Sequence, residues 1–237
     1  MSIIIVFLAA ILSAVGWWVW RQGIGSKPWL HVGIPAGTPG ADVPAVPAAK
    51  TGLGVFLAVA GCLFALFVSA YSMRMQMGDW WPMPVPPILW VNTGVLVMSS
   101  VALGWARMSC RNGEVERMRV GLIAALVFAL VFLAGQVAAW RELAAAGYTL
   151  SSNPANSFFY LITGAHGLHV LGGLFALART TEAGLTAQGT RGARDLLLRI
   201  DLCDIYWHFL LVVWLILLAL LAGWAGEFMV ICRQLLT

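Results

Sequence analysis

Two stretches in the C-terminal half of the chain decide the fold: residues 157–173 read SFFYLITGAHGLHVLGG, and residues 206–214 read YWHFLLVVW. Both are apolar and both carry histidine: His166 and His169 in the first, His208 in the second. Together with their apolar neighbours they predict membrane-spanning helices, in which an ionisable side chain is costly and marks a functional or packing site. The three histidines are therefore the first candidates for such a site.

The composition of the whole chain indicates a membrane protein. Of the 237 residues, 61% are hydrophobic and only 10% are charged, whereas a soluble domain has about 25% charged residues. The formal net charge of +4 is read as a sign of membrane topology and not of nucleic-acid binding. The four cysteines contain no Cys-x-x-Cys pair, so they indicate neither a disulfide framework nor a zinc site.

The pattern of apolar segments predicts an all-α, polytopic membrane helix bundle with six transmembrane helices. A helix rises ~1.5 Å per residue, so about 20 apolar residues cross a hydrocarbon core of ~30 Å. We expect an N-terminal transmembrane helix over 1–21, a Pro/Gly/Ala-rich extramembrane linker over 22–50, and a five-helix core over 51–237. The alternative for residues 1–21, a signal peptide, is weakened because no Lys or Arg precedes the apolar run.

Within the core, apolar segments and turn residues place the individual helices. We expect helices over about 52–73, 86–106, 120–140, 157–177 and 205–224. The segments 107–119 and 179–204 are expected to be charged loops, the second with a short surface helix near 194–199.

Basic residues are distributed unevenly between the two sides of this arrangement. Eleven fall on one side, namely Arg21, Lys27, Lys50, Arg107, Arg111, Arg117, Arg119, Arg179, Arg191, Arg194 and Arg199, and three on the other, Arg74, Arg141 and Arg233. Because basic residues collect in cytoplasmic loops, both termini are expected to face away from the cytoplasm.

The histidines allow two interpretations. His166 and His169 are three residues apart and share one helix face. One interpretation is a metal or haem site between helices. The other is a set of interhelical hydrogen bonds, with close helix approach allowed by Gly164, Gly167, Gly172 and Gly173. We favour packing, because His208 lies at a different depth and no expected helix offers the acidic ligands of a di-metal site away from its ends. We therefore predict no catalytic and no metal-binding residue.

The remaining polar and aromatic residues are assigned by depth. Asn92, Gln136 and Thr163 are expected to tie helices together, although a solvent-filled path lined by Asn92 and Gln136 would suit a channel or transporter. A proton relay is disfavoured, because Asp204 and the other acidic residues fall in loops or at helix ends. Interface or lipid contacts are expected for Trp90, Trp140, Tyr206, Trp207 and Trp214.

One family carries the same motifs. Thr163-Gly164-x-His166-Gly167-x-His169-Val170, followed by Tyr206-Trp207-His208-Phe209, resembles subunit III of the haem–copper respiratory oxidases (cytochrome c oxidase subunit 3). The likeness runs from about Gly52 to Trp224 and includes Trp90-Val91-Asn92-Thr93 and the set Phe132, Gln136 and Trp140. Family members usually carry carboxylates at three positions where this chain has Ala60, Ala139 and Leu211, so the resemblance does not extend to carboxylate chemistry.

The resemblance implies an accessory, non-catalytic subunit of a terminal oxidase in a bacterial plasma membrane. It would pack on oxidase subunit I, with subunit II in the same complex, hold structural phospholipids, and leave haem and copper to the partner subunits. The extra N-terminal helix would contact a further subunit. The nearest alternatives are a subunit III-like component of a nitric oxide reductase or of a quinol oxidase. An alternative of a different class is a small membrane haem or metal carrier.

Overall fold

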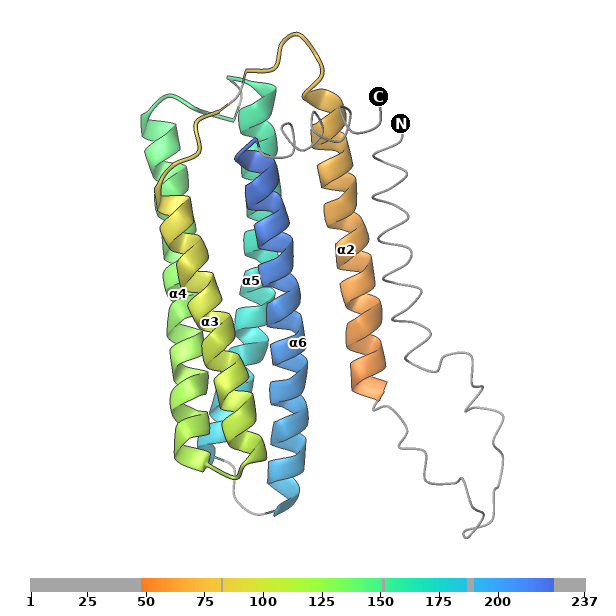
Figure 1. Ribbon diagram of the computed structural model, residues 1–237, viewed down its shortest axis with the longest axis vertical. Coiled ribbons are helices and arrows are strands. Elements are labelled where there is room, and N and C mark those ends of the chain that lie inside the picture. Colours follow the sequence, from red (N-terminus) through yellow and green to blue (C-terminus); the bar gives the residue numbers. More distant parts are fainter. Residues whose placement is uncertain (1–47, 82, 151, 187–189, 224–237) are drawn as a thin grey trace, which may run out of the picture. The chain divides into compact units, whose positions relative to one another are not determined.

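The computed structural model describes residues 48–81, 83–150, 152–186 and 190–223 (Figure 1). These residues form five helices: α2 (Ala48–Arg74), α3 (Ile88–Arg111), α4 (Val115–Ala145), α5 (Pro154–Thr186) and α6 (Thr190–Leu221). Each contains a segment long and apolar enough to cross a membrane, which confirms the predicted all-α membrane bundle for this part of the chain. The expected helix over 1–21, the linker up to residue 47, and Trp224 lie outside the described residues.

The expected loop over 107–119 is wrong. Helix α3 continues to Arg111 and α4 begins at Val115, so only a three-residue turn separates them. In this turn Gly113 has a φ of +76°, a conformation that glycine adopts without strain. Hydropathy marks only the part of a helix that lipid surrounds, whereas Arg and Glu are good helix formers in water.

The expected loop over 179–204 is wrong for the same reason. Helix α5 continues to Thr186 and α6 begins at Thr190, and no proline after Pro154 interrupts either helix. The short surface helix expected near 194–199 is therefore part of α6. The helix expected to begin near 205 is longer by several turns, which moves Asp204 from a loop to a helix interior.

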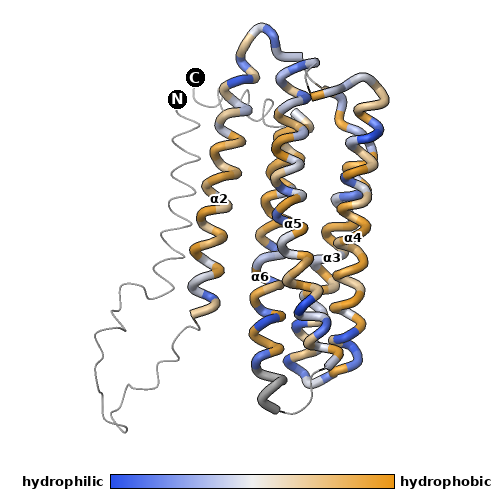
Figure 2. Tube along the Cα trace, turned by 180° about the vertical axis from the view of Figure 1, so that it is seen from behind, coloured by the Kyte–Doolittle hydropathy of each residue, from blue (hydrophilic) through white to orange (hydrophobic). Residues whose placement is uncertain are grey.

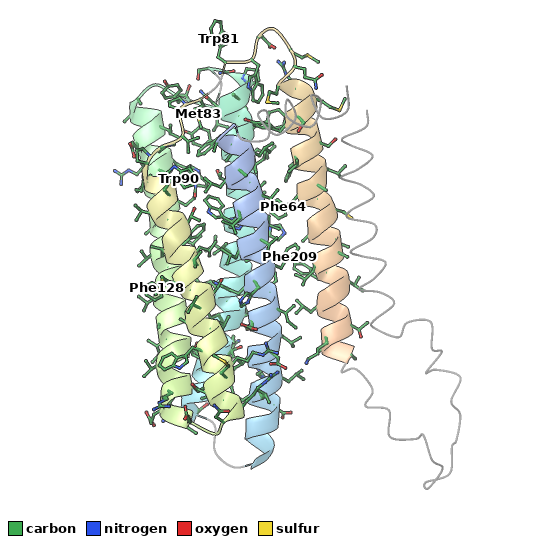
Figure 3. The ribbon with its side chains drawn as sticks, in the orientation of Figure 1. Phe64, Trp81, Met83, Trp90, Phe128 and Phe209 are labelled. Atoms are coloured by element: carbon green, nitrogen blue, oxygen red, sulfur yellow. The ribbon has the colours of Figure 1, made fainter. Side chains whose placement is uncertain are left out.

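Helices α3 to α6 form a bundle in which each helix has two neighbours. The contacting pairs are α3 with α4, α4 with α5, α5 with α6, and α6 with α3 (Figure 1). From Gly61 onward, α2 belongs to the same compact unit. There Phe64 and Tyr71 pack with Ile162 of α5 and with α6, and Phe64 and Phe209 lie between α6 and this part of α2 (Figure 3).

The residues along the middle of the helices are mostly hydrophobic, and hydrophilic residues gather towards the helix ends (Figure 2). Large apolar side chains such as Val101, Val127, Leu168 and Phe175 are exposed. Exposed apolar surface of this extent is unfavourable in water and suits a lipid environment.

Close helix contacts depend on Gly121, which was not expected, and on Gly173, which was. A Cβ on Gly121 of α4 would lie 2.8 Å from the Ala106 Cβ of α3, and one on Gly173 of α5 would lie 2.9 Å from the Trp207 ring of α6. By contrast, a Cβ on Gly167 would meet nothing within 4 Å, and one on Gly164 would meet only the Trp140 ring at 3.9 Å. Of the four expected glycines, Gly173 therefore lies at a close helix contact, whereas Gly164, Gly167 and Gly172 do not.

Candidate functional site

His166 is the central polar residue of the bundle. Its side chain is fully buried, and its Nε2 lies 3.1 Å from the Leu210 carbonyl oxygen of α6. Because a carbonyl oxygen can only accept, Nε2 carries the hydrogen and donates it. The imidazole ring also lies 4.9 Å from the Trp214 ring and 5.8 Å from the Phe132 ring, measured between centroids. His166 thus joins α5 to both α6 and α4.

The other neighbouring helix pairs are also joined by side-chain hydrogen bonds. The bonds are Trp214 Nε1 to Thr93 Oγ1 (2.9 Å, α6 to α3), Trp140 Nε1 to Thr163 Oγ1 (3.1 Å, α4 to α5) and Ser99 Oγ to the Ala125 carbonyl oxygen (2.9 Å, α3 to α4). Buried polar groups in a membrane bundle must find partners within the protein. Ser99, Trp140 and Trp214 have such partners on the adjacent helix, so these three side chains connect helices.

The three histidines do not converge on one site. His169 Nδ1 lies 2.8 Å from the Ala165 carbonyl oxygen of its own helix, and its ring packs 5.2 Å from the Phe64 ring. His208 is half exposed, with Nδ1 2.8 Å from the Asp204 carbonyl oxygen. Among the described residues, no group of three His, Cys, Asp or Glu side chains is placed to hold a metal ion.

The aromatic residues of α6 are not lipid contacts. Trp207 and Trp214 are fully buried, and Tyr206 is 9% exposed with its hydroxyl donating to the His169 carbonyl oxygen at 2.8 Å. The prediction for these three was wrong, because α6 begins well before residue 205 and places them inside the bundle. Trp90 is 46% exposed, as an interface residue would be.

A charged cluster at the arginine-rich end of the bundle was not expected. Arg107 of α3 pairs through Nε with Asp201 Oδ1 at 2.5 Å and through Nη1 with Asp204 Oδ2 at 3.0 Å. Arg111 also reaches Asp201 at 3.3 Å, and His208 Nδ1 lies 3.4 Å from Asp204 Oδ1. Both aspartate side chains are only 8% exposed. The expectation that acidic residues occur only at helix ends or in loops is therefore wrong.

The positions expected to have lost carboxylates are apolar and largely enclosed. Ala139 is fully buried and Ala60 is 4% exposed, while Leu211 is of intermediate exposure. Among the described residues, the buried carboxylates lie elsewhere, at Asp201 and Asp204, and both are paired with arginine.

The loop between α2 and α3 is fixed at its base and near its middle. Arg74 Nη1 donates to Asp79 Oδ1 at 2.6 Å, and Asn153 Nδ2 donates to the Trp81 carbonyl oxygen at 2.6 Å. The hydrogen bond from Arg74 lowers the pKa of the Asp79 carboxyl below its ordinary value. The Trp81 side chain projects from this loop and is 72% exposed (Figure 3).

These features define a polytopic membrane protein in which several interior polar residues connect helices. Comparison with known proteins identifies the family. Residues 49–226 match the family described as Cytochrome c oxidase subunit III. The chain belongs to this family, and the resemblance predicted from its histidine motifs is confirmed.

Relatives from distant organisms carry the same family name. The chain is 36% identical over 160 residues to a probable cytochrome c oxidase subunit 3 of Mycobacterium leprae, covering 64% of this chain and 75% of the relative. It is 32% identical over 182 residues to the cytochrome c oxidase subunit 3 of Thermostichus vulcanus, and this match covers 72% of this chain and 84% of the relative. It is 30% identical over 176 residues to the cytochrome c oxidase subunit 3 of Ornithorhynchus anatinus, and this match covers 70% of this chain and 64% of the relative. The chain is thus an accessory subunit III of a haem–copper oxidase.

Proposed function

We propose that this chain is the structural subunit III of a bacterial respiratory terminal oxidase, packed against catalytic subunit I in a complex that also contains subunit II. In this role it stabilises the catalytic subunit together with bound phospholipid and performs no chemistry itself. Haem and copper belong to the partner subunits. The observation that carries the proposal is the family match over residues 49–226.

The bonding of the histidines supports a structural role. A ring nitrogen of His166 faces a backbone carbonyl of the neighbouring helix, and ring nitrogens of His169 and His208 face carbonyls of their own helices. Of these three contacts, the one made by His166 joins two helices, which supports its role in packing.

We further propose that the arginine-rich end of the bundle faces the cytoplasm of a bacterial plasma membrane. Within the described residues, this end brings together arginines from all four helices of the bundle: Arg107, Arg111, Arg117, Arg119, Arg179 and Arg199. Short cytoplasmic segments are enriched in Lys and Arg. With the expected additional transmembrane helix over 1–21, both chain termini would be on the outer side.

Copurification tests the assignment. The tagged full-length chain is extracted in mild detergent, its partners are identified by mass spectrometry, and an absorption spectrum is taken. We expect a haem–copper subunit I to copurify, with the haem bound to that partner. An untagged chain in the same membranes is the control. A chain isolated without subunit I but with its own Soret band would contradict the proposal.

Activity assays on the same preparation distinguish a cytochrome c oxidase from a quinol oxidase and a nitric oxide reductase. Oxygen consumption with reduced cytochrome c as donor supports a cytochrome c oxidase. Activity with quinol alone, or reduction of nitric oxide in place of oxygen, would assign the chain to one of the other two complexes.

A further inference from the structure

One layer of the α3–α6 bundle contains buried polar atoms that have no hydrogen-bond partner among the described residues. They belong to three side chains on three helices: Asn92 Nδ2 on α3, Gln136 Nε2 and Oε1 on α4, and His166 Nδ1 on α5. The three residues are at most 3% exposed. Lipid provides no partners for such atoms, so leaving them unpaired is unfavourable.

The level of Gln136 in the bundle follows from its neighbours one turn away on α4. One turn before it on α4, the Phe132 ring is 5.8 Å from the His166 ring. One turn after it, Trp140 donates to Thr163 of α5 at 3.1 Å. Residues four apart share a helix face, so Gln136 faces α5 between the levels of Thr163 and His166.

Asn92 lies in the same layer. Its Oδ1 lies against Gly135 of α4, the residue adjacent to Gln136. The next residue on α3, Thr93, accepts the hydrogen bond of Trp214, whose ring is 4.9 Å from the His166 ring. Asn92, Gln136 and His166 therefore lie at similar levels of the bundle.

The unpaired atoms include both donors and acceptors. His166 Nε2 donates to the Leu210 carbonyl oxygen, so in the neutral ring Nδ1 is an acceptor. Gln136 Oε1 is a second acceptor, and the amide nitrogens of Gln136 and Asn92 are donors. A cation would be repelled by the amide donors, and an apolar molecule would leave every atom unpaired. A water molecule, with two hydrogens and two lone pairs, matches the set.

We propose that Asn92, Gln136 and His166 form a binding site for an internal water molecule that links α3, α4 and α5. The water donates to His166 Nδ1 and Gln136 Oε1 and accepts from an amide nitrogen of Asn92 or Gln136. The site lies inside one chain, so it does not depend on which oxidase the chain serves.

Two measurements on the full-length chain, with the subunits that copurify with it, test this site. The first is a cryo-EM map at a resolution that shows ordered water. The second is a double-mutant cycle of Gln136→Leu and His166→Phe, read as the midpoint of thermal unfolding. Gln76→Leu is the matched control, because Gln76 is exposed.

We expect water density between Gln136 and His166, and a fall in midpoint for the double variant that is smaller than the sum of the two single falls. Coupling of this kind arises when two residues share a partner. The control should leave the midpoint unchanged. A map in which Gln136 and His166 bond directly with no density between them, or additive effects of the two substitutions, would overturn the proposal.

Discussion

At the scale of single residues, the buried position of the His166 ring depends on a hydrogen bond to one backbone carbonyl. A buried imidazole in lipid is costly, and its Nε2 hydrogen bond to Leu210 together with the flanking aromatic rings offsets part of that cost. Neither the carbonyl nor the rings could be identified from the sequence, because both are brought to His166 by other helices. The sequence could predict only that a histidine at this depth needs a partner.

Replacing His166 tests how much its contacts contribute to the free energy of unfolding. His166→Ala removes a fully buried ring that contacts two helices, and we expect a loss of about 2–4 kcal/mol in unfolding free energy. His208→Ala, at a side chain that is 52% exposed, should cost less than about 1 kcal/mol. Unfolding in mixed micelles monitored by circular dichroism provides both values. Equal effects of the two substitutions would contradict the interior role of His166.

A second residue-scale prediction concerns Gly135. A Cβ at this position would overlap Asn92 Oδ1, so Gly135→Ala should lower the unfolding free energy by about 1–3 kcal/mol. Gly172→Ala is the control, because its Cβ would meet nothing within 4 Å, and alanine is the better helix former by about 1 kcal/mol. The same unfolding assay should show a stabilised control. A destabilised Gly172→Ala and a neutral Gly135→Ala would refute the contact.

At the scale of elements, apolar segments predicted that the five described helices exist but not where they end. Hydropathy detects the part of a helix that lipid covers, and the helix continues into water wherever its residues permit. The largest error in the predicted boundaries was the start of α6, which was expected near residue 205 and lies at Thr190. Asp201, Asp204 and His208 are spaced three and four apart, a signal for one helix face that would have placed both carboxylates on that face.

The contact between α3 and α6 depends on Arg107. Removing it leaves two enclosed aspartates without their main cation, so Arg107→Gln should cost about 3 kcal/mol. Arg117→Gln removes an exposed pair with Glu114 and should cost less than about 1 kcal/mol. Limited proteolysis and thermal unfolding of the purified complex distinguish the two. A loss for Arg107→Gln no larger than for Arg117→Gln would show that the cluster does not hold these helices together.

The loop after α2 should respond to acid. Arg74 lowers the pKa of Asp79 in the folded chain, so the pair stabilises the loop above the unfolded pKa of about 3.9. This stabilisation is lost as the pH falls through the lower, folded pKa. Hydrogen exchange of residues 75–81 should therefore accelerate at low pH, beyond the intrinsic pH dependence of exchange. Asp79→Asn should remove this additional acceleration, and its persistence in that variant would assign it to another group.

At the scale of the whole molecule, reporter fusions test the proposed orientation in the membrane. Reporter fusions in the turns at Gly113, between α3 and α4, and at Gly147, between α4 and α5, should give opposite results. The arginine-rich end carries Gly113, so a cytoplasmic reporter such as green fluorescent protein should be active there. Alkaline phosphatase, which is active outside the cytoplasm, should be active at Gly147. The reverse pattern would invert the proposed topology.

The Arg107 cluster also bears on how the bundle meets membranes of different thickness. Moving α6 past α3 by one turn, about 5.4 Å, would separate Arg107 from both Asp201 and Asp204. Sliding of these two helices is therefore opposed by their own charges. A thinner or thicker bilayer must then be accommodated by tilting the two helices together or by deformation of the lipid around them. The ion pairs thus fix the relative height of α3 and α6 in the membrane.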